Sequence, residues 1–108
     1  MKTAKEIETE ISIVRKEIKD GKSIRRNKAR IVFLRQCKLY IETDPSLSYL
    51  NSEVETIKFK IKVLDERYPA WCAQKNLSQW KNPLSHYRSE AGIPLLKSQL
   101  KTLKFILE

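Results

Sequence analysis

The residues best suited to binding chemistry form one basic segment between residues 21 and 41. It holds seven Lys and Arg residues and no Asp or Glu, whereas residues 1–20 hold five bases and five acids. Four of the seven are Arg, whose guanidinium offers paired donors to phosphate and carboxylate oxygens. The candidate contacts are Lys22, Arg25, Arg26, Lys28, Arg30 and Arg35. We expect them to bind an acidic partner, in the first place a nucleic-acid backbone, which such contacts position without reading its bases.

The same charges allow a second interpretation, in which acids of the protein itself neutralise them. Residues 1–20 carry carboxylates that antiparallel packing of two neighbouring helices would bring beside the basic segment. These carboxylates belong to Glu6, Glu8, Glu10, Glu17 and Asp20. On a helical wheel the bases scatter around the axis instead of lining one edge, which weakens the nucleic-acid interpretation. The net charge of +9 suits an acidic partner, either nucleic acid or an acidic protein surface, but it also suits a solvated Lys-rich surface.

Aromatic side chains gather between residues 68 and 88 and are interleaved with bases. They are Tyr68, Trp71, Trp80, His86 and Tyr87, which we call the aromatic corner. Such groups stack on nucleobases or anchor protein interfaces. The members expected at the surface, as a possible interface, are Trp80, Lys81, Tyr87 and Arg88. The alternative is that the tryptophans close the open end of a helical bundle, each indole N–H bonded to a backbone carbonyl.

Catalytic chemistry has few candidate residues in this sequence. His86 is the only histidine, so a general base would be this residue or a perturbed carboxylate. A dyad of Cys72 with His86 lies in no recognisable nucleophile motif, and Cys37 and Cys72 are more typical of small buried hydrophobes. CxxC and HxxxH spacings are absent, as is a Gly-rich phosphate loop. We therefore expect no enzyme, no cofactor and no metal site.

The elements that position these residues are predicted to be helices. Seven apolar residues recur at alternating steps of three and four, a heptad seam typical of coiled coils and helical hairpins. They are Leu47, Leu50, Val54, Ile57, Ile61, Leu64 and Tyr68. Residues 57–63 also alternate apolar and basic side chains, as a strand would. The longer heptad match, with no Gly or Pro inside it, favours a helix over 45–67.

Capping signals delimit the first helices. Thr3 and Glu6 form a capping box, and Gly21 suits the left-handed residue that follows a helix end, so we expect a helix over about 4–20. Ser23 is the expected cap of a helix over about 24–42. Asp44, followed by Pro45, is the expected start of the helix over 45–67.

Breakers become frequent after residue 68. Asn82 and Pro83 predict the start of one of several short helices within 70–91, and Gly92 predicts its end. A last amphipathic helix is expected over about 94–107. The fold class is therefore all-α. It is predicted to be one domain over 1–108, a helical bundle of three to four long amphipathic helices in coiled-coil-like hairpins, with a short irregular helical insertion before the last.

Two functions follow from this sequence-based picture. The first is a small non-enzymatic protein whose basic helix, about 22–38, contacts nucleic acid. The alternative is a protein–protein adaptor, inhibitor or assembly accessory protein, of the viral or mobile-element type, that acts through the aromatic corner 68–88 and exposed helix seams. In this alternative the protein could also form a homodimer through the seam of 45–67. The opening MKTAKEIETE has acids where a signal peptide needs an apolar run, so we expect a cytoplasmic protein without membrane association.

Overall fold

The structure, a computed structural model, describes residues 1–44, 46–77 and 80–108. Within these ranges 82% of the residues are helical and none lies in a strand, which confirms the all-α prediction. The helices are α1 (Ala4–Lys19), α2 (Ile24–Thr43), α3 (Ser48–Glu66), α4 (Tyr68–Gln74), α5 (Pro83–Ala91) and α6 (Ile93–Leu107). The strand alternative for residues 57–63 is wrong, because α3 runs through them without a break.

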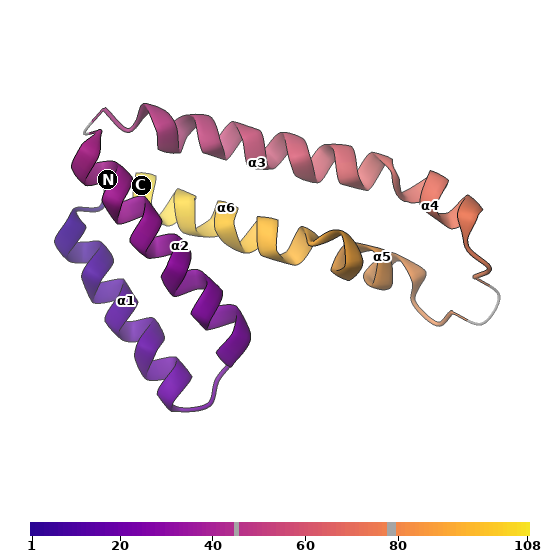
Figure 1. Ribbon diagram of the computed structural model, residues 1–108, viewed down its shortest axis with the longest axis horizontal. Helices are drawn as coiled ribbons and strands as arrows, with labels where there is room; N and C mark the ends of the chain where they lie inside the picture. Colours follow the sequence, from indigo (N-terminus) through magenta and orange to yellow (C-terminus); the bar gives the residue numbers. More distant parts are fainter. Residues whose placement is uncertain (45, 78–79) are drawn as a thin grey trace.

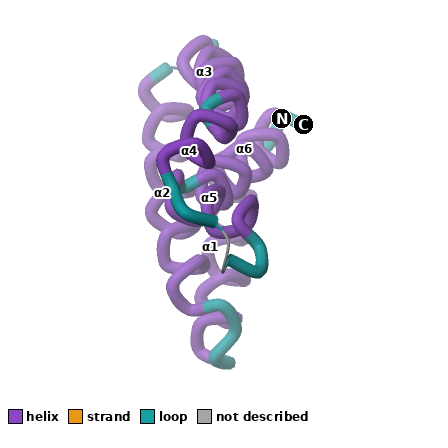
Figure 2. The backbone as a smooth tube through the Cα atoms, turned by 90° about the vertical axis from the view of Figure 1, so that its right-hand side faces the viewer, coloured by secondary structure: helices purple, strands orange, loops and turns teal. Residues whose placement is uncertain are grey.

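The helices form two hairpins arranged in a flat layer. Helices α1 and α2 make the first hairpin, while α3 and α4 run out along a longer arm and α5 and α6 return beside them (Figure 1). The molecule measures 51 × 35 × 17 Å and is a narrow slab when seen edge-on (Figure 2). Its radius of gyration is 16.7 Å, against about 13 Å for a compact domain of this length. The layer therefore leaves more helix surface exposed than a closed bundle would.

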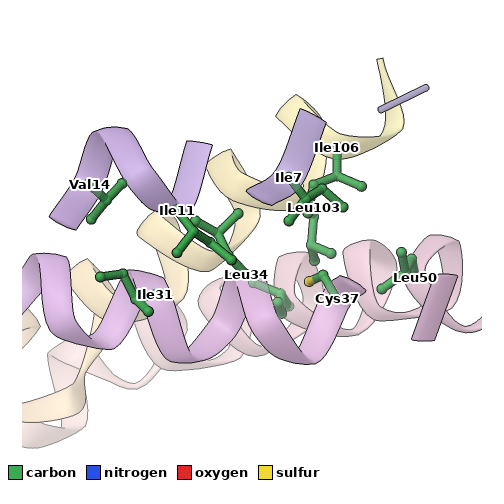
Figure 3. Close-up of a cluster of buried hydrophobic side chains, with 10 residues drawn as sticks. Ile7, Ile11, Val14, Ile31, Leu34, Cys37, Leu50, Leu103 and Ile106 are labelled. Carbon is green, nitrogen blue, oxygen red and sulfur yellow. The ribbon is translucent and has the colours of Figure 1, made fainter. Parts of the chain in front are cut away.

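The core lies where α2 packs against α6 and the two hairpins meet. Its buried members come from four helices, at the spacing that places them on one face of each helix. They are Ile7, Ile11, Val14, Ile31, Leu34, Cys37, Leu50, Ile57, Leu103 and Ile106, most of which Figure 3 shows. The chain ends meet at the same place, because the Lys2 amide donates a 2.7 Å hydrogen bond to the Ile106 carbonyl. Apolar burial thus joins hairpins that are distant in sequence.

The heptad seam of α3 is directed towards α6. Leu50 and Ile57 are fully buried, while Val54, Ile61 and Leu64 are half-buried. Phe59 lies on the opposite side of the helix and is 66% exposed. A homodimer through this seam stays a prediction, since α6 already covers much of it within the chain.

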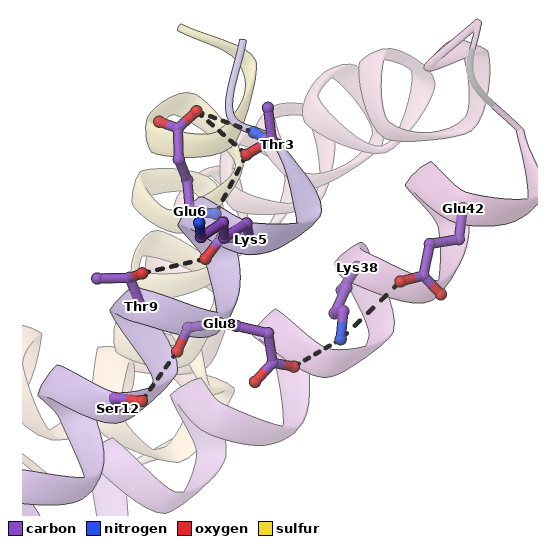
Figure 4. Close-up of polar contacts among 8 residues, drawn as sticks. All are labelled: Thr3, Lys5, Glu6, Glu8, Thr9, Ser12, Lys38 and Glu42. Carbon is purple, nitrogen blue, oxygen red and sulfur yellow. Dashed lines mark hydrogen bonds and ion pairs between the residues drawn. The ribbon is translucent and has the colours of Figure 1, made fainter.

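Several predicted helix ends are present. The Thr3 hydroxyl accepts a hydrogen bond from the Glu6 amide, and the Glu6 carboxylate accepts one from the Thr3 amide (Figure 4). Gly21 has φ +81°, and the amides of Gly21 and Lys22 donate to the carbonyls of Ile18 and Glu17, so α1 ends in a Schellman motif.

Two predicted helix caps are wrong, although α2 begins at Ile24 as predicted. Ser23 precedes α2, but with φ +41° its side chain makes no capping hydrogen bond. Asp44 does not cap α3, which begins at Ser48; its carboxylate instead accepts bonds from the amide and hydroxyl of Ser46. This local turn competes with the helix cap for the same carboxylate. The other half of that expectation, Pro45, lies outside the described residues.

Candidate nucleic-acid interface

Two bases of α2 are neutralised by acids of α1. Arg30 lies 3.2 Å from the Glu10 carboxylate, and Lys38 lies 2.7 Å from that of Glu8 (Figure 4 shows the second pair). The hydrogen bond and charge of Lys38 lower the pKa of Glu8. Antiparallel packing of α1 on α2 creates both pairs, so the interpretation of an internally neutralised hairpin is correct for these two bases.

The other bases of the segment do not share one side of α2. Lys22, Arg25, Arg26, Lys28 and Arg35 are all exposed. Arg26 lies on the side of α2 that borders α6, where Arg30 joins it one turn later. Lys28 and Arg35 are exposed and do not line the space between α2 and α6, and the charge of Arg35 helps to lower the pKa of Glu8 on α1. The fold therefore does not bring all six predicted contact residues to one surface.

Arg26 and Arg30 form one wall of a notch whose other wall is α6. Lys97 and Lys101 line this second wall, and the space between the helices measures about 300 Å³. We call this space, with its four bases, the cationic notch. Each wall carries its two bases at positions i and i+4, which project from the same side of a helix. Asn27, Pro94, Ser98 and Thr102 complete the lining.

Two buried polar side chains of the notch lining make hydrogen bonds within their own parts of the fold. The Asn27 side chain is buried and donates to the Lys22 carbonyl at 2.8 Å and to the Glu17 carboxylate at 3.3 Å, which fastens the start of α2 to the end of α1. The Thr102 hydroxyl is buried and donates to the Ser98 carbonyl.

The cationic notch has an excess of positive charge. In residues 1–44, 46–77 and 80–108, no carboxylate lies within 4.0 Å of Arg26, Lys97 or Lys101. The guanidinium of Arg30 keeps a buried Nε–H without a hydrogen-bond partner, although its Nη2 binds Glu10. Like charges gathered between two helices raise the local potential and attract an anion.

The sequence interpretation missed Lys97 and Lys101. Their i, i+4 spacing, which places them on one side of α6 beside the stripe of Leu96, Leu100 and Leu103, is visible in the sequence. That pattern marks them as exposed, but only the packing of α2 on α6 shows that they lie opposite Arg26 and Arg30.

A second, less polar hollow adjoins the notch. It measures about 640 Å³ and shares Arg26, Pro94 and Ser98 with the cationic notch. Its apolar lining comes from Ile24, Ala29, Pro94 and Leu95, and we call this hollow the apolar recess. Ile24 is 45% exposed and Leu95 51% exposed. Arg25 and Ser23 lie at its edge.

The aromatic corner packs on itself at the far end of the long arm. Ring centroids of Trp71 lie 5.4 Å from those of Trp80 and 5.2 Å from those of Tyr87, and Trp80 meets His86 edge-on at 4.5 Å. The expectation that Tyr87 is exposed is wrong: it is buried, and its hydroxyl donates to the Leu64 carbonyl. The rings of Tyr68 and Trp71 in α4 pack against that of Tyr87 in α5 and so join the two antiparallel segments of the arm.

The remaining members of the predicted interface differ in how exposed they are. Arg88 is half-buried, with its Nε 3.7 Å from the Asp65 carboxylate. Trp80 is half-buried and Lys81 is exposed. Accessible ring surface in the aromatic corner therefore comes from the exposed His86 and from the half-buried Tyr68, Trp71 and Trp80.

Other kinds of site find little support in the described part of the chain. There, no three His, Cys, Asp or Glu side chains group closely enough to hold a metal ion. Each helix among these residues is also too short or too polar to cross a lipid bilayer. No protein-family model, no curated protein and no solved structure matches this chain.

Proposed function

We propose that this protein is a non-enzymatic binding protein that holds nucleic acid by its phosphate backbone in the cationic notch. The observation that carries the proposal is the placement of Arg26 and Arg30 opposite Lys97 and Lys101, with Glu10 as the one carboxylate paired to any of them among the described residues. Cations without internal partners attract a polyanion and release its counterions on binding.

The chemistry of this binding is hydrogen bonding to phosphate oxygens. Arg26 presents a guanidinium that suits two oxygens of one phosphate, and each lysine presents an ammonium that bonds as a point charge. Bonds of this kind position a strand without reading its sequence. With three to four phosphates contacted, the slope of log affinity against log salt concentration should be about −2 to −4.

Fluorescence anisotropy of labelled oligonucleotides at about 50 mM and about 200 mM salt tests the proposal, because backbone contacts weaken steeply over this range. The variant Arg26→Glu/Lys97→Glu/Lys101→Glu should lose binding. A matched control, Lys60→Glu/Lys62→Glu/Lys75→Glu, makes the same change in net charge at exposed positions outside the notch and should keep most of it. Equal losses in both variants would show that only net charge matters, and would overturn the assignment to the notch.

A second candidate function is protein binding through the outer side of α2. Here Arg25, Lys28, Val32, Arg35 and Leu39 follow one another at steps of three, four, three and four, and all are exposed; we call them the outer stripe. Val32 is 56% exposed and Leu39 58% exposed. This is a coiled-coil-like seam whose bases repel a second copy and favour a helix with acids beside its apolar residues.

A synthetic acidic heptad peptide tests this second candidate. It should bind the parent protein and lose affinity for Val32→Asp/Leu39→Asp, while nucleic-acid binding in the notch stays unchanged. The exposed Phe59 of α3 supplies the control, since Phe59→Asp changes an equally exposed apolar residue outside the stripe. Equal peptide binding by all three proteins would contradict the candidate.

A further inference from the structure

We infer that the nucleic acid held in the cationic notch is unpaired, with its phosphates on the notch and its bases against the apolar recess. This inference rests on the proposed function and specifies its ligand. It starts from the continuity of the two hollows, which share Arg26, Pro94 and Ser98. A ligand that fills both must carry negative charge on one side and apolar surface on the other.

The apolar recess has surface to offer to such a ligand. Ile24 and Leu95 are each about half exposed, and Ala29 and Pro94 lie with them. Covering these side chains with another apolar surface removes them from water, which is favourable in proportion to the area buried. The faces of unpaired nucleobases are surfaces of this kind.

A base-paired nucleic-acid duplex does not provide these surfaces. In a duplex the base faces are stacked on one another, and only base edges are presented in grooves, of which the major groove of B-DNA is about 12 Å wide. A duplex that laid one phosphate strand along the notch would leave Ile24 and Leu95 in water. The recess, at about 640 Å³, is instead a space for a few splayed bases.

The arrangement of the cations also favours a strand over an acidic peptide. Each wall carries its bases one helical turn apart, about 6 Å along the axis, so the notch offers two short rows of positive charge. A phosphate chain carries one charge at every residue and can meet such rows in succession. An acidic amphipathic helix is the competing occupant, and its binding to the two hollows is one of the outcomes that would overturn the inference.

The experiment compares three labelled ligands with the same number of phosphates per strand, of about 16 nucleotides each. They are a single strand, the same strand in a duplex, and an abasic single strand that keeps the phosphates but has no bases. At about 50 mM salt the intact single strand should bind about tenfold more tightly than the abasic strand, because only it covers the recess. It should also bind more tightly than the duplex.

The matched variants leave the charge of the notch unchanged. Ile24→Ser/Leu95→Ser should weaken the intact single strand to the level of the abasic strand, and should leave the abasic strand and the duplex unaffected. Phe59→Ser, an exposed apolar residue of α3 outside the recess, should change none of the three. Circular dichroism should show equal helix content, since all three positions are exposed.

The possible failures are distinguishable. If the duplex and the abasic strand bind as tightly as the intact strand, the proposed function stands and the inference of an unpaired ligand is overturned. If no nucleic acid binds even at low salt, the proposed function itself fails and the inference fails with it. Binding of a synthetic acidic amphipathic peptide instead, with loss in Ile24→Ser/Leu95→Ser, would assign the two hollows to a protein partner and overturn both.

Discussion

Arg30 binds Glu10 of α1 at 3.2 Å and at the same time lines the cationic notch between α2 and α6. Arg26, one turn earlier on the same side of α2, lines the notch without a carboxylate nearby in the described part of the chain. The ion pair thus ties the two helices of the first hairpin together and reduces the charge that Arg30 offers to a ligand.

Replacing Glu10 with Gln should strengthen nucleic-acid binding. The change removes the carboxylate that competes with a phosphate for Arg30. The slope of log affinity against log salt concentration should therefore become steeper, by the value that corresponds to about one more phosphate contact. Because both side chains are partly exposed, the free energy of unfolding should fall by no more than about 1 kcal/mol. Glu8→Gln, which removes one of the two carboxylates paired with Lys38 outside the notch, is the matched control; an equal gain in affinity for both variants would contradict a specific role for Arg30.

Cys37 and Cys72 should differ sharply in reactivity. Burial, with a smaller contribution from the Glu53 charge, raises the pKa of Cys37 from 9.0 to about 12. At about pH 8 an aromatic disulfide reagent should therefore label one thiol of the folded protein, Cys72, and the second only after unfolding. The variant Cys72→Ser should abolish the rapid reaction, and rapid labelling that persists in it would contradict the burial of Cys37.

The raised pKa of Cys37 also has a consequence for stability. The neutral thiol is favoured in the folded state, so its contribution is fully present below pH 9.0 and is lost as the pH rises towards about 12. Chemical denaturation of the parent and of Cys37→Ala over this range should show a steeper decline for the parent. Parallel curves would rule out a titrating thiol at this position.

Tyr87→Phe should destabilise the protein without affecting the notch. The Tyr87 hydroxyl donates to the Leu64 carbonyl from a buried position, so its removal leaves that carbonyl with one partner fewer. We expect a loss of about 1 kcal/mol in the free energy of unfolding. The fluorescence of Trp71 and Trp80 reports unfolding of this end of the arm, and unchanged stability would indicate that the aromatic rings alone hold it closed.

Gly92→Ala should cost about 1 kcal/mol, the penalty of a left-handed conformation for a residue with a Cβ. Gly92 has φ +77° between α5 and α6, and among the described residues no atom beyond Gly92 and its two neighbours lies within 4 Å of the position that a Cβ would occupy. The loss therefore comes from the backbone and not from a clash. Gly92→Asn, which tolerates this conformation better, should lose less, and equal losses would point to another cause.

Local signals in the sequence determined most of the helix ends. The capping box of Thr3 and Glu6, the left-handed Gly21 and Gly92, and the Asn82 cap all act over a few residues, so each could be predicted from its own segment. The start of α3 could not be predicted in this way. The Asp44 carboxylate could accept a hydrogen bond either from an amide of the helix start or from Ser46, and it binds Ser46. Apolar spacing likewise indicated which face of each helix is buried.

Only the tertiary structure decided which helices cover those faces. The contacts of Leu34 and Cys37 with the core of α6, around Leu103 and Ile106, set the two hairpins against each other. That packing places Lys97 and Lys101 opposite Arg26 and Arg30, separates them from Lys28 and Arg35, and folds Tyr87 inward. Periodicity specifies a buried stripe but not its partner, because every apolar stripe of suitable length buries similar area against any other.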